Sequence, residues 1–344
     1  MTPATFDFLK NGIQVSSVIL SALINTTLIV LIVTKSAKKM GNYRHLMVYF
    51  CCCSILFSTM DIIVRPIIHT HRSAFFMIMD LRNRDIPLDI AGFMVCAMAG
   101  CFGVIIYGIA IHFIYRYFAV ERQGRIKYFD KKFLPFWFLI PLLGGVSWTL
   151  VSWFLFPMTT VTSAYIGPDL AEAFDLDINR SAYAAALFFA PDPNGQEVFS
   201  QKCGLGLVFY LLIMTIPFSI LIFVGIKSIG KIKEFPSSNY GKGLQMQLYK
   251  ALIAQTVIPV FLLFAPFGVL FICPIFEIHC KSLATILTFV YAIYPVVDPL
   301  PILFFVQNYR NALTEFFYCC RCQKKMSSRV HIAPEEISRD ADSN

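Results

Sequence analysis

Long apolar runs separated by short polar segments dominate the hydropathy pattern of this chain. A helix needs about 20 mostly apolar residues to cross a bilayer. Five runs of that length contain no Asp, Glu, Lys or Arg, and two more contain only one or two such residues. The pattern predicts an all-α membrane protein, a bundle of seven transmembrane helices. We place these helices at residues 12–33, 46–68, 90–115, 133–156, 203–226, 251–276 and 282–306.

The segments outside the apolar runs are short, with one exception. Residues 157–202 form a long, acidic loop between the fourth and fifth predicted helices. Residues 1–11 precede the first helix. After the seventh helix, apolar residues recur at helical spacing over 307–320, which predicts an amphipathic helix on the membrane surface. Residues 321–344 are polar, and we expect a disordered tail there.

The distribution of Lys and Arg predicts the orientation of the bundle, because cytoplasmic loops carry an excess of these residues. With the N-terminus outside, 21 of the 29 Lys and Arg residues fall in the first, third and fifth loops and in the tail, all on the cytoplasmic side. We therefore expect an extracellular N-terminus and a cytoplasmic C-terminus in a plasma-membrane protein. The net charge of +8 follows from this bias and does not indicate nucleic-acid binding.

The composition excludes several other classes of protein. Hydrophobic residues make up 57% of the chain and charged residues 15%, against roughly 25% charged in soluble domains. A disordered chain, a small disulfide scaffold and an ordinary soluble enzyme are all excluded. The sequence also lacks the HExxH, GxSxG, P-loop and GxGxxG motifs. We therefore predict no enzymatic activity, no cofactor and no metal site.

Two charged residues interrupt the second predicted helix. Asp61 and Arg65 are four residues apart, so both would lie on one helix face and could neutralise each other. Ionisable groups inside a bilayer cost about 2.5–3.5 kcal/mol on insertion scales and are often functional. One interpretation is a structural ion pair packed against neighbouring helices. The other is a pair that lines a water-accessible cavity and orients a polar group of a ligand.

A second polar cluster ends the third predicted helix. His112, Tyr115, Arg116 and Tyr117 lie at its cytoplasmic end, where Arg and Tyr commonly extend toward the membrane interface. The alternative is a switch in which Arg116 is held inward in one state and offered to a partner in another.

The seventh predicted helix carries a buried carboxyl in a proline-rich stretch. Asp298 precedes Pro299, and two further prolines lie within three residues of Asp298. Prolines remove helix hydrogen bonds, so Asp298 could hydrogen-bond the freed backbone groups, bind a cation, or simply fill a kink as a neutral acid. Prolines also kink the sixth helix. A bundle with two bent helices could rearrange its inner face when a ligand binds in the outer half.

The outer halves of the helices are apolar and aromatic, which suits a small, weakly polar ligand. We expect the ligand to bind near Asp61 and Arg65. The candidate contact residues are Met98, Cys101, Phe209, Tyr210, Phe264, Phe267 and Tyr291, with Met94, Phe102 and Thr288 as further candidates.

Several residues are candidates for modification. Asn179 begins an N-glycosylation motif in the long loop. A disulfide between Cys96 and Cys203 could tie the third helix to that loop, or both thiols could stay reduced. Cys319, Cys320 and Cys322, beside basic residues, are either palmitoylation sites or free cytosolic thiols. We expect His69 and His71 simply to be solvated in an outer loop.

Several local strings resemble one known family, the nematode Str-type chemoreceptors (serpentine receptor class r). The resemblance extends over residues 41–310, and its motifs are specific as a set. The strings are GNYRHLM (41–47), DIIVRPIIH (61–69), HFIYRYFA (112–119), QLYKAL (247–252), APFGV (265–269) and YPVVDPL (294–300).

The resemblance implies a G-protein-coupled receptor for external chemicals in the ciliary membrane of sensory neurons. It also implies that Arg116 and Asp298 are activation-switch residues. Tyr115-Arg116-Tyr117 stands where rhodopsin-like receptors carry an acid followed by Arg-Tyr, and Asp298-Pro299 stands where they carry Asn-Pro. The missing acid puts the usual ion lock of those receptors in doubt.

We therefore predict an olfactory-type receptor that binds a small odorant or metabolite and activates a heterotrimeric G protein. The alternatives are a secondary transporter or a ligand-gated channel, with Asp61, Arg65 and Asp298 in an ion pathway. The sequence shows no internal repeat, which counts against a transporter built from inverted repeats.

Overall fold

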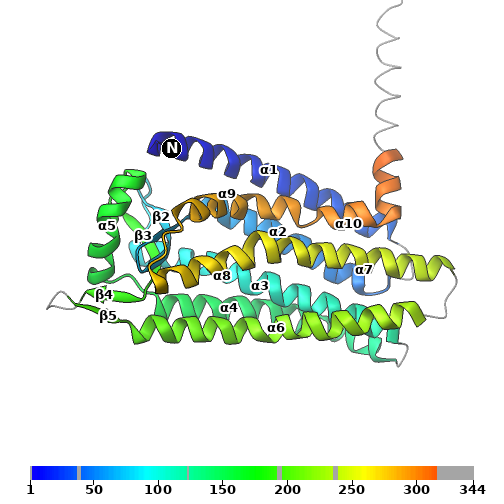
Figure 1. Ribbon diagram of the computed structural model, residues 1–344. Helices are drawn as coiled ribbons and strands as arrows, with labels where there is room; N and C mark the ends of the chain where they lie inside the picture. Colours follow the sequence, from blue (N-terminus) through cyan, green and yellow to red (C-terminus); the bar gives the residue numbers. More distant parts are fainter. Residues whose placement is uncertain (1, 37–39, 122–123, 192–195, 235–238, 316–344) are drawn as a thin grey trace, which may run out of the picture.

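The computed structural model describes residues 2–36, 40–121, 124–191, 196–234 and 239–315. Within these ranges, seven helices are long and apolar enough to cross a membrane, which confirms the predicted seven-helix fold. They lie roughly alongside one another in one bundle (Figure 1). The first five are α1 (Pro3–Lys35), α2 (Tyr43–Val64), α3 (Leu88–Glu121), α4 (Leu134–Leu155) and α6 (Gln201–Glu234).

The sixth and seventh spans are interrupted at their prolines. In the sixth, α7 (Asn239–Pro259) continues through a π-helical turn, η4 (Val260–Phe264), into α8 (Ala265–Ile272) and the short η5 (Cys273–Phe276). In the seventh, α9 (Lys281–Val297) ends at Asp298, and α10 (Leu300–Phe305) follows. Each proline lacks the N–H that would continue the helix, so both spans bend at positions that the sequence predicted.

The second helix ends earlier than expected. Arg65 adopts a left-handed conformation, with φ of 50°, and its N–H caps the helix on the carbonyl of Asp61. Pro66 follows directly and disfavours continuation of the helix. Residues 67 and 68, which we had placed in the membrane, are instead part of a β-strand.

A small three-stranded antiparallel sheet covers one end of the bundle, which we call the capped end (Figure 1). The sheet was not predicted, and the long loop supplies its third strand. The strands are β1 (Ile67–His71), β2 (Ala74–Asp80) and β3 (Ser181–Leu187). Also at this end are α5 (Thr160–Phe174), η3 (Ile178–Arg180) and a hairpin of β4 (Phe189–Pro191) and β5 (Glu197–Phe199).

Both faces of this sheet are buried. In the β2–β3 pair, Phe75 lies opposite Ala186 and Met77 opposite Ala184. Because successive side chains point to opposite faces, these residues face the helix bundle, whereas the alternate ones pack against α5 and the start of α1. The sheet is therefore an inner layer, with the helices below it and α5 above it.

The helix α3 forms the centre of the bundle and approaches α4 closely. A Cβ atom added at Gly103 would lie 2.4 Å from the carbonyl oxygen of Gly144, and one at Gly100 would lie 2.7 Å from that of Gly145. Small residues at such contacts allow two backbones to pack directly against each other. The 3₁₀ turn η2 (Arg125–Phe129) joins α3 to α4 at the opposite end from the cap.

The chain turns away from the bundle axis after the seventh span (Figure 1). Residues 307–315 are helical. The remainder of the predicted surface helix, the predicted tail and the three candidate palmitoylation cysteines lie outside the described residues.

Candidate functional site

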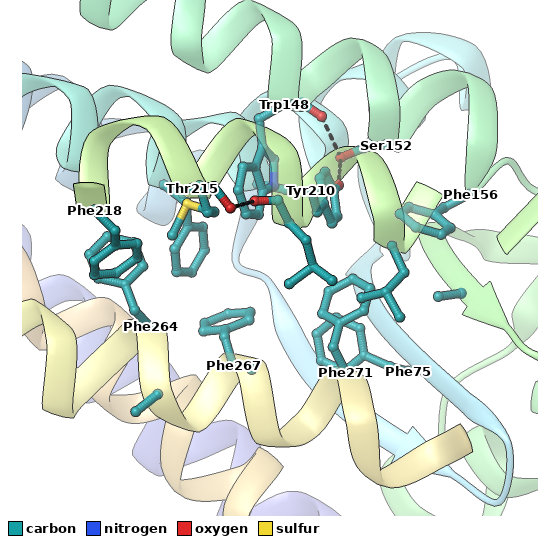
Figure 2. Close-up of a pocket in the computed structure, with 18 of the residues that line it drawn as sticks. Phe75, Trp148, Ser152, Phe156, Tyr210, Thr215, Phe218, Phe264, Phe267 and Phe271 are labelled. Atoms are coloured by element: carbon teal, nitrogen blue, oxygen red, sulfur yellow. Dashed lines mark hydrogen bonds between the residues drawn. The ribbon is translucent and has the colours of Figure 1, made fainter. Parts of the chain in front are cut away.

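A cavity of about 540 Å³ lies directly beneath the sheet, between α3, α4, α6, η4 and α8. Aromatic side chains from all these elements point into it (Figure 2). The strands β2 and β3 form its roof. The lining residues that carry the argument below are Phe75, Phe102, Trp148, Tyr210, Phe264, Phe267 and Phe271.

The cavity wall is apolar and uncharged. None of its lining residues is Asp, Glu, Lys, Arg or His. The indole of Trp148 stacks on the ring of Tyr210, with centroids 4.1 Å apart. The Tyr210 and Ser152 hydroxyls are hydrogen-bonded to each other, and the Ser152 hydroxyl also donates to the Trp148 carbonyl at 3.0 Å. Since these hydroxyls are already paired, the cavity suits an uncharged ligand with few polar groups.

Three predicted contact residues line this cavity, namely Tyr210, Phe264 and Phe267, together with the further candidate Phe102. Tyr291 lies directly behind Phe102, with ring centroids 5.3 Å apart, and its hydroxyl donates to the carbonyl of Met98. The remaining candidates are not in the lining. Phe209 is on the exposed face of α6, and Cys101 hydrogen-bonds back to its own helix; Met94 and Thr288 also lie outside the lining.

Sequence reasoning missed the residues that come from the sheet and from α4. Phe75 and Met77 arrive from β2, which we had expected to be loop. Trp148 and Tyr210 lie on different helices, and only the packing of α4 against α6 brings them together. The tryptophan was a usable signal, because the chain has only three and this one lies mid-helix.

The predicted ion pair between Asp61 and Arg65 does not form, so that prediction was wrong. Arg65 has left the helical conformation, and its Nε donates to the carbonyl of Ile62 at 3.4 Å. Asp61 is buried, and its Oδ1 has no hydrogen-bond partner among the described residues. Neither Asp61 nor Arg65 lines the cavity.

Asp298 is the centre of a hydrogen-bonded network that joins four helices. Its carboxylate accepts from the hydroxyls of Ser54 in α2, at 3.1 Å, and Tyr294 in α9, at 2.9 Å. Its backbone carbonyl accepts from the amide of Gln255 in α7, at 3.2 Å. The proline break therefore leaves Asp298 bonded to side chains of α2, α7 and α9.

A second part of this network involves α1. The carbonyl of Pro295 would normally accept from the N–H four residues later, but that residue is Pro299, which has none. Asn25 donates to this carbonyl at 3.2 Å and Ser21 at 3.4 Å. Two side chains of α1 thus replace the hydrogen bond that the helix loses.

Arg116 is held inside the bundle at the end opposite the cap. Its side chain is 2% exposed, and its guanidinium carbon lies 3.6 Å from the centre of the Tyr43 ring. One guanidinium nitrogen donates to Oε1 of Gln245 in α7 at 2.9 Å. An aromatic ring and an amide side chain therefore hold the guanidinium of Arg116 in place.

Neighbouring residues of the same cluster fix this arrangement. His112 hydrogen-bonds the Tyr43 hydroxyl at 3.0 Å, and the Tyr115 hydroxyl donates to the carbonyl of Met40 at 3.2 Å. Tyr117 points elsewhere and donates to Glu121 at 2.8 Å. Of the four predicted residues at the end of α3, three surround Tyr43.

An ion cluster ties the cap to the seventh span. Asp169 of α5 accepts from His69 at 3.0 Å and from His71 at 2.9 Å, and it is paired with Lys281 at the start of α9. Burial acts to raise the pKa of Asp169, but the hydrogen bonds from His69 and Lys281 and the nearby histidines outweigh it, so the pKa is below its ordinary value. Burial lowers the pKa of His71. The expectation that these histidines are merely solvated was wrong.

The candidate disulfide is not formed, because Cys96 and Cys203 are both free and buried. Asn179 is exposed in η3 at the capped end, and its glycosylation stays a prediction.

Comparison with known proteins gives one consistent result. The family model for the serpentine type 7TM GPCR chemoreceptor Str matches residues 10–314. Serpentine receptor class r-10 of Caenorhabditis briggsae is 31% identical, over 85% of this chain and 84% of that protein. The class r-10 receptor of Caenorhabditis elegans is 30% identical, over 91% of both chains. The G-protein coupled receptor str-217 of C. elegans is 25% identical, over 93% of this chain and 92% of that protein.

Proposed function

Because this chain belongs to the Str family of serpentine seven-transmembrane chemoreceptors, we propose that it detects a small, uncharged external molecule and activates a heterotrimeric G protein. The ligand binds in the aromatic cavity beneath the sheet. The family is a receptor family, and the resemblance noted in the sequence is confirmed.

One observation carries the proposal: the sixth transmembrane span reaches both functional regions. Near the capped end, Phe264 of η4 and Phe267 of α8 form part of the cavity wall. At the other end, α7 of the same span carries Gln245, which bonds Arg116. A ligand that pushes against η4 therefore acts on the helix that holds Arg116 inward.

The proposed mechanism is a shift between two arrangements of this span. A ligand shifts such an equilibrium only if it binds one arrangement more tightly than the other. A molecule seated between Phe102, Phe264 and Phe267 favours the arrangement with more room at η4. The accompanying movement of α7 separates Gln245 from Arg116, and the guanidinium becomes available to the G protein.

The proposed orientation places the capped end outside the cell and the Arg116 end in the cytoplasm. The Lys and Arg distribution supports it, because most of these residues flank the helices at the Arg116 end. Asn179 would then be on the outer side. The plasma membrane, and specifically the ciliary membrane of chemosensory neurons, is the proposed location.

The test is ligand-dependent nucleotide exchange on a G protein in reconstituted membranes, with a panel of small volatiles and polar metabolites as probes. Substrate flux and membrane current are recorded in parallel, because a transporter or a channel would produce one of these without a G protein. We expect Arg116→Ala to abolish the evoked exchange while surface expression persists. Normal exchange in that variant would remove Arg116 from the mechanism.

A further inference from the structure

The cavity is closed toward the capped end. Phe75, Met77 and Ala186 of its roof are each at most 6% exposed. The sheet that contains the roof is hydrogen-bonded to the helices at its sides: the N–H of Ala185 donates to the carbonyl of Phe156 at 3.2 Å, and the N–H of Ile68 in β1 donates to the hydroxyl of Thr288 at 3.0 Å. A ligand arriving from the aqueous side would have to break the hydrogen bonds that hold this sheet to the helices.

Further contacts hold the sheet together and to the helices. The N–H of Phe188 donates to the carbonyl of Ser73 at 3.0 Å, which extends the pairing of β2 and β3 by one residue. Asp169 joins β1 to the start of α9 through His69 and Lys281. Opening the roof would therefore also disturb buried hydrogen bonds and an ion cluster, each costly to leave unpaired.

The side of the cavity between α6 and α8 is different. Four residues of α6 that line the cavity are also exposed on the outer surface of the bundle, and their spacing places them along one stripe of the helix. They are Leu211, Thr215, Ser219 and Ile222, of which Leu211 is 58% and Ile222 63% exposed.

Small residues form the opposite edge. Ala265 is exposed and Gly268 half-buried, and both line the cavity. A Cβ atom added at Gly268 would meet nothing within 4 Å. We call the opening between these two edges the α6–α8 slot. Because it lies on the flank of a membrane-spanning bundle, it faces the hydrocarbon of the bilayer.

We propose that the ligand is an apolar molecule that dissolves in the bilayer and enters the cavity sideways through the α6–α8 slot. This inference rests on the proposed function, since it assigns the entry route and ligand class of the same cavity. Sideways entry requires rotation of a few side chains, whereas entry through the cap requires backbone hydrogen bonds to break. A charged ligand is excluded, because neither the bilayer nor the cavity wall would compensate its charge.

The test uses the cavity tryptophan as a reporter. Trp137→Phe and Trp153→Phe leave Trp148 as the sole tryptophan, and 1-bromonaphthalene serves as an apolar quencher of its fluorescence. Stopped-flow mixing of the probe with the protein in nanodiscs gives a rate and a final extent of quenching. We expect Gly268→Phe to slow quenching at least fivefold and to leave its final extent unchanged, because the ring obstructs the slot and leaves the cavity open.

Two further variants make the result decisive. Val269→Phe is the matched control, because Val269 is the next residue, exposed on the same helix and outside the cavity lining. In this variant Trp148 should be quenched at the wild-type rate. Thr215→Phe obstructs the slot from the α6 side and replaces Gly268→Phe if that variant does not fold. A wild-type rate in the slot variants would overturn sideways entry and leave the cavity as the binding site. No quenching of Trp148 in the parent protein at equilibrium would overturn the cavity itself, and the proposed function with it.

Discussion

The contact between Arg116 and Gln245 can be tested without knowing the ligand, because it should control basal activity. Gln245→Leu removes the acceptor that lies 2.9 Å from the guanidinium. A hydrogen bond to a charged group contributes about 1.5–3 kcal/mol. The Tyr43 ring, 3.6 Å from the guanidinium carbon, continues to hold Arg116, so we take the lower end of that range.

A change of about 1.4 kcal/mol corresponds to tenfold in an equilibrium constant. We therefore expect Gln245→Leu to raise ligand-independent nucleotide exchange about tenfold, measured with purified G protein and receptor in nanodiscs. Gln245→Glu should act in the opposite direction, because a carboxylate at this position pairs with the guanidinium and holds it more firmly.

The control is Gln247→Leu. Gln247 lies two residues further along α7 and hydrogen-bonds Gln307 instead of Arg116. Its basal exchange should match the wild type. If Gln245→Leu has the same basal rate as the wild type and Gln247→Leu, Arg116 is not restrained by this contact and the reasoning fails.

Two predictions concern stability. The lowered pKa of Asp169 means that its ionised form stabilises the fold at every pH above the ordinary value of 3.8, and that this contribution is lost as the pH falls further toward the folded-state pKa. Asp169→Asn should therefore lower the thermal midpoint at neutral pH, and the difference in midpoint from the wild type should shrink below pH 3.8. The control is Asp175→Asn at an exposed position, which should change the midpoint little at either pH. An equal effect of the two variants would contradict the role of the ion cluster. The second prediction is that Gly103→Ala destabilises the receptor, because the added methyl group would lie 2.4 Å from the Gly144 carbonyl oxygen. In the control Gly12→Ala, the added methyl group has no neighbour within 4 Å, so this variant should be neutral or stabilising by up to about 1 kcal/mol. Equal thermal midpoints for the two variants would refute the close packing of α3 against α4.

The seven helices could be predicted because a bilayer imposes a length and a composition on every segment that crosses it. The bends in the sixth and seventh spans also followed from the sequence, since proline removes a specific hydrogen bond wherever it occurs. Arg65 shows the limit of this reasoning: its spacing from Asp61 suits a helical ion pair, but Pro66 ends the helix and Arg65 turns away.

The sheet could not be predicted, because its strands do not carry the usual pattern. The segment SAYAAAL of β3 has no β-branched residue, and its burial on both faces removes the alternation of polar and apolar positions. The histidine cluster depended on the sheet, since only the folded cap brings His69 and His71 to Asp169. Of the cavity, the aromatic residues on α6, η4 and α8 could be anticipated, while its roof could not.

The hydrogen bonds from Ser21 and Asn25 to the carbonyl of Pro295 restrict the sequence that α1 can have. A bare carbonyl in hydrocarbon costs several kcal/mol, so the oxygen of Pro295 depends on these two side chains. The first helix therefore satisfies a carbonyl left free at the proline break in the seventh span. An unrelated helix of equal length and hydrophobicity could not replace it. Asn25 also begins a glycosylation motif, yet its side chain is fully buried and its amide nitrogen donates to the carbonyl of Pro295, so no glycosylating enzyme could reach it in the assembled receptor.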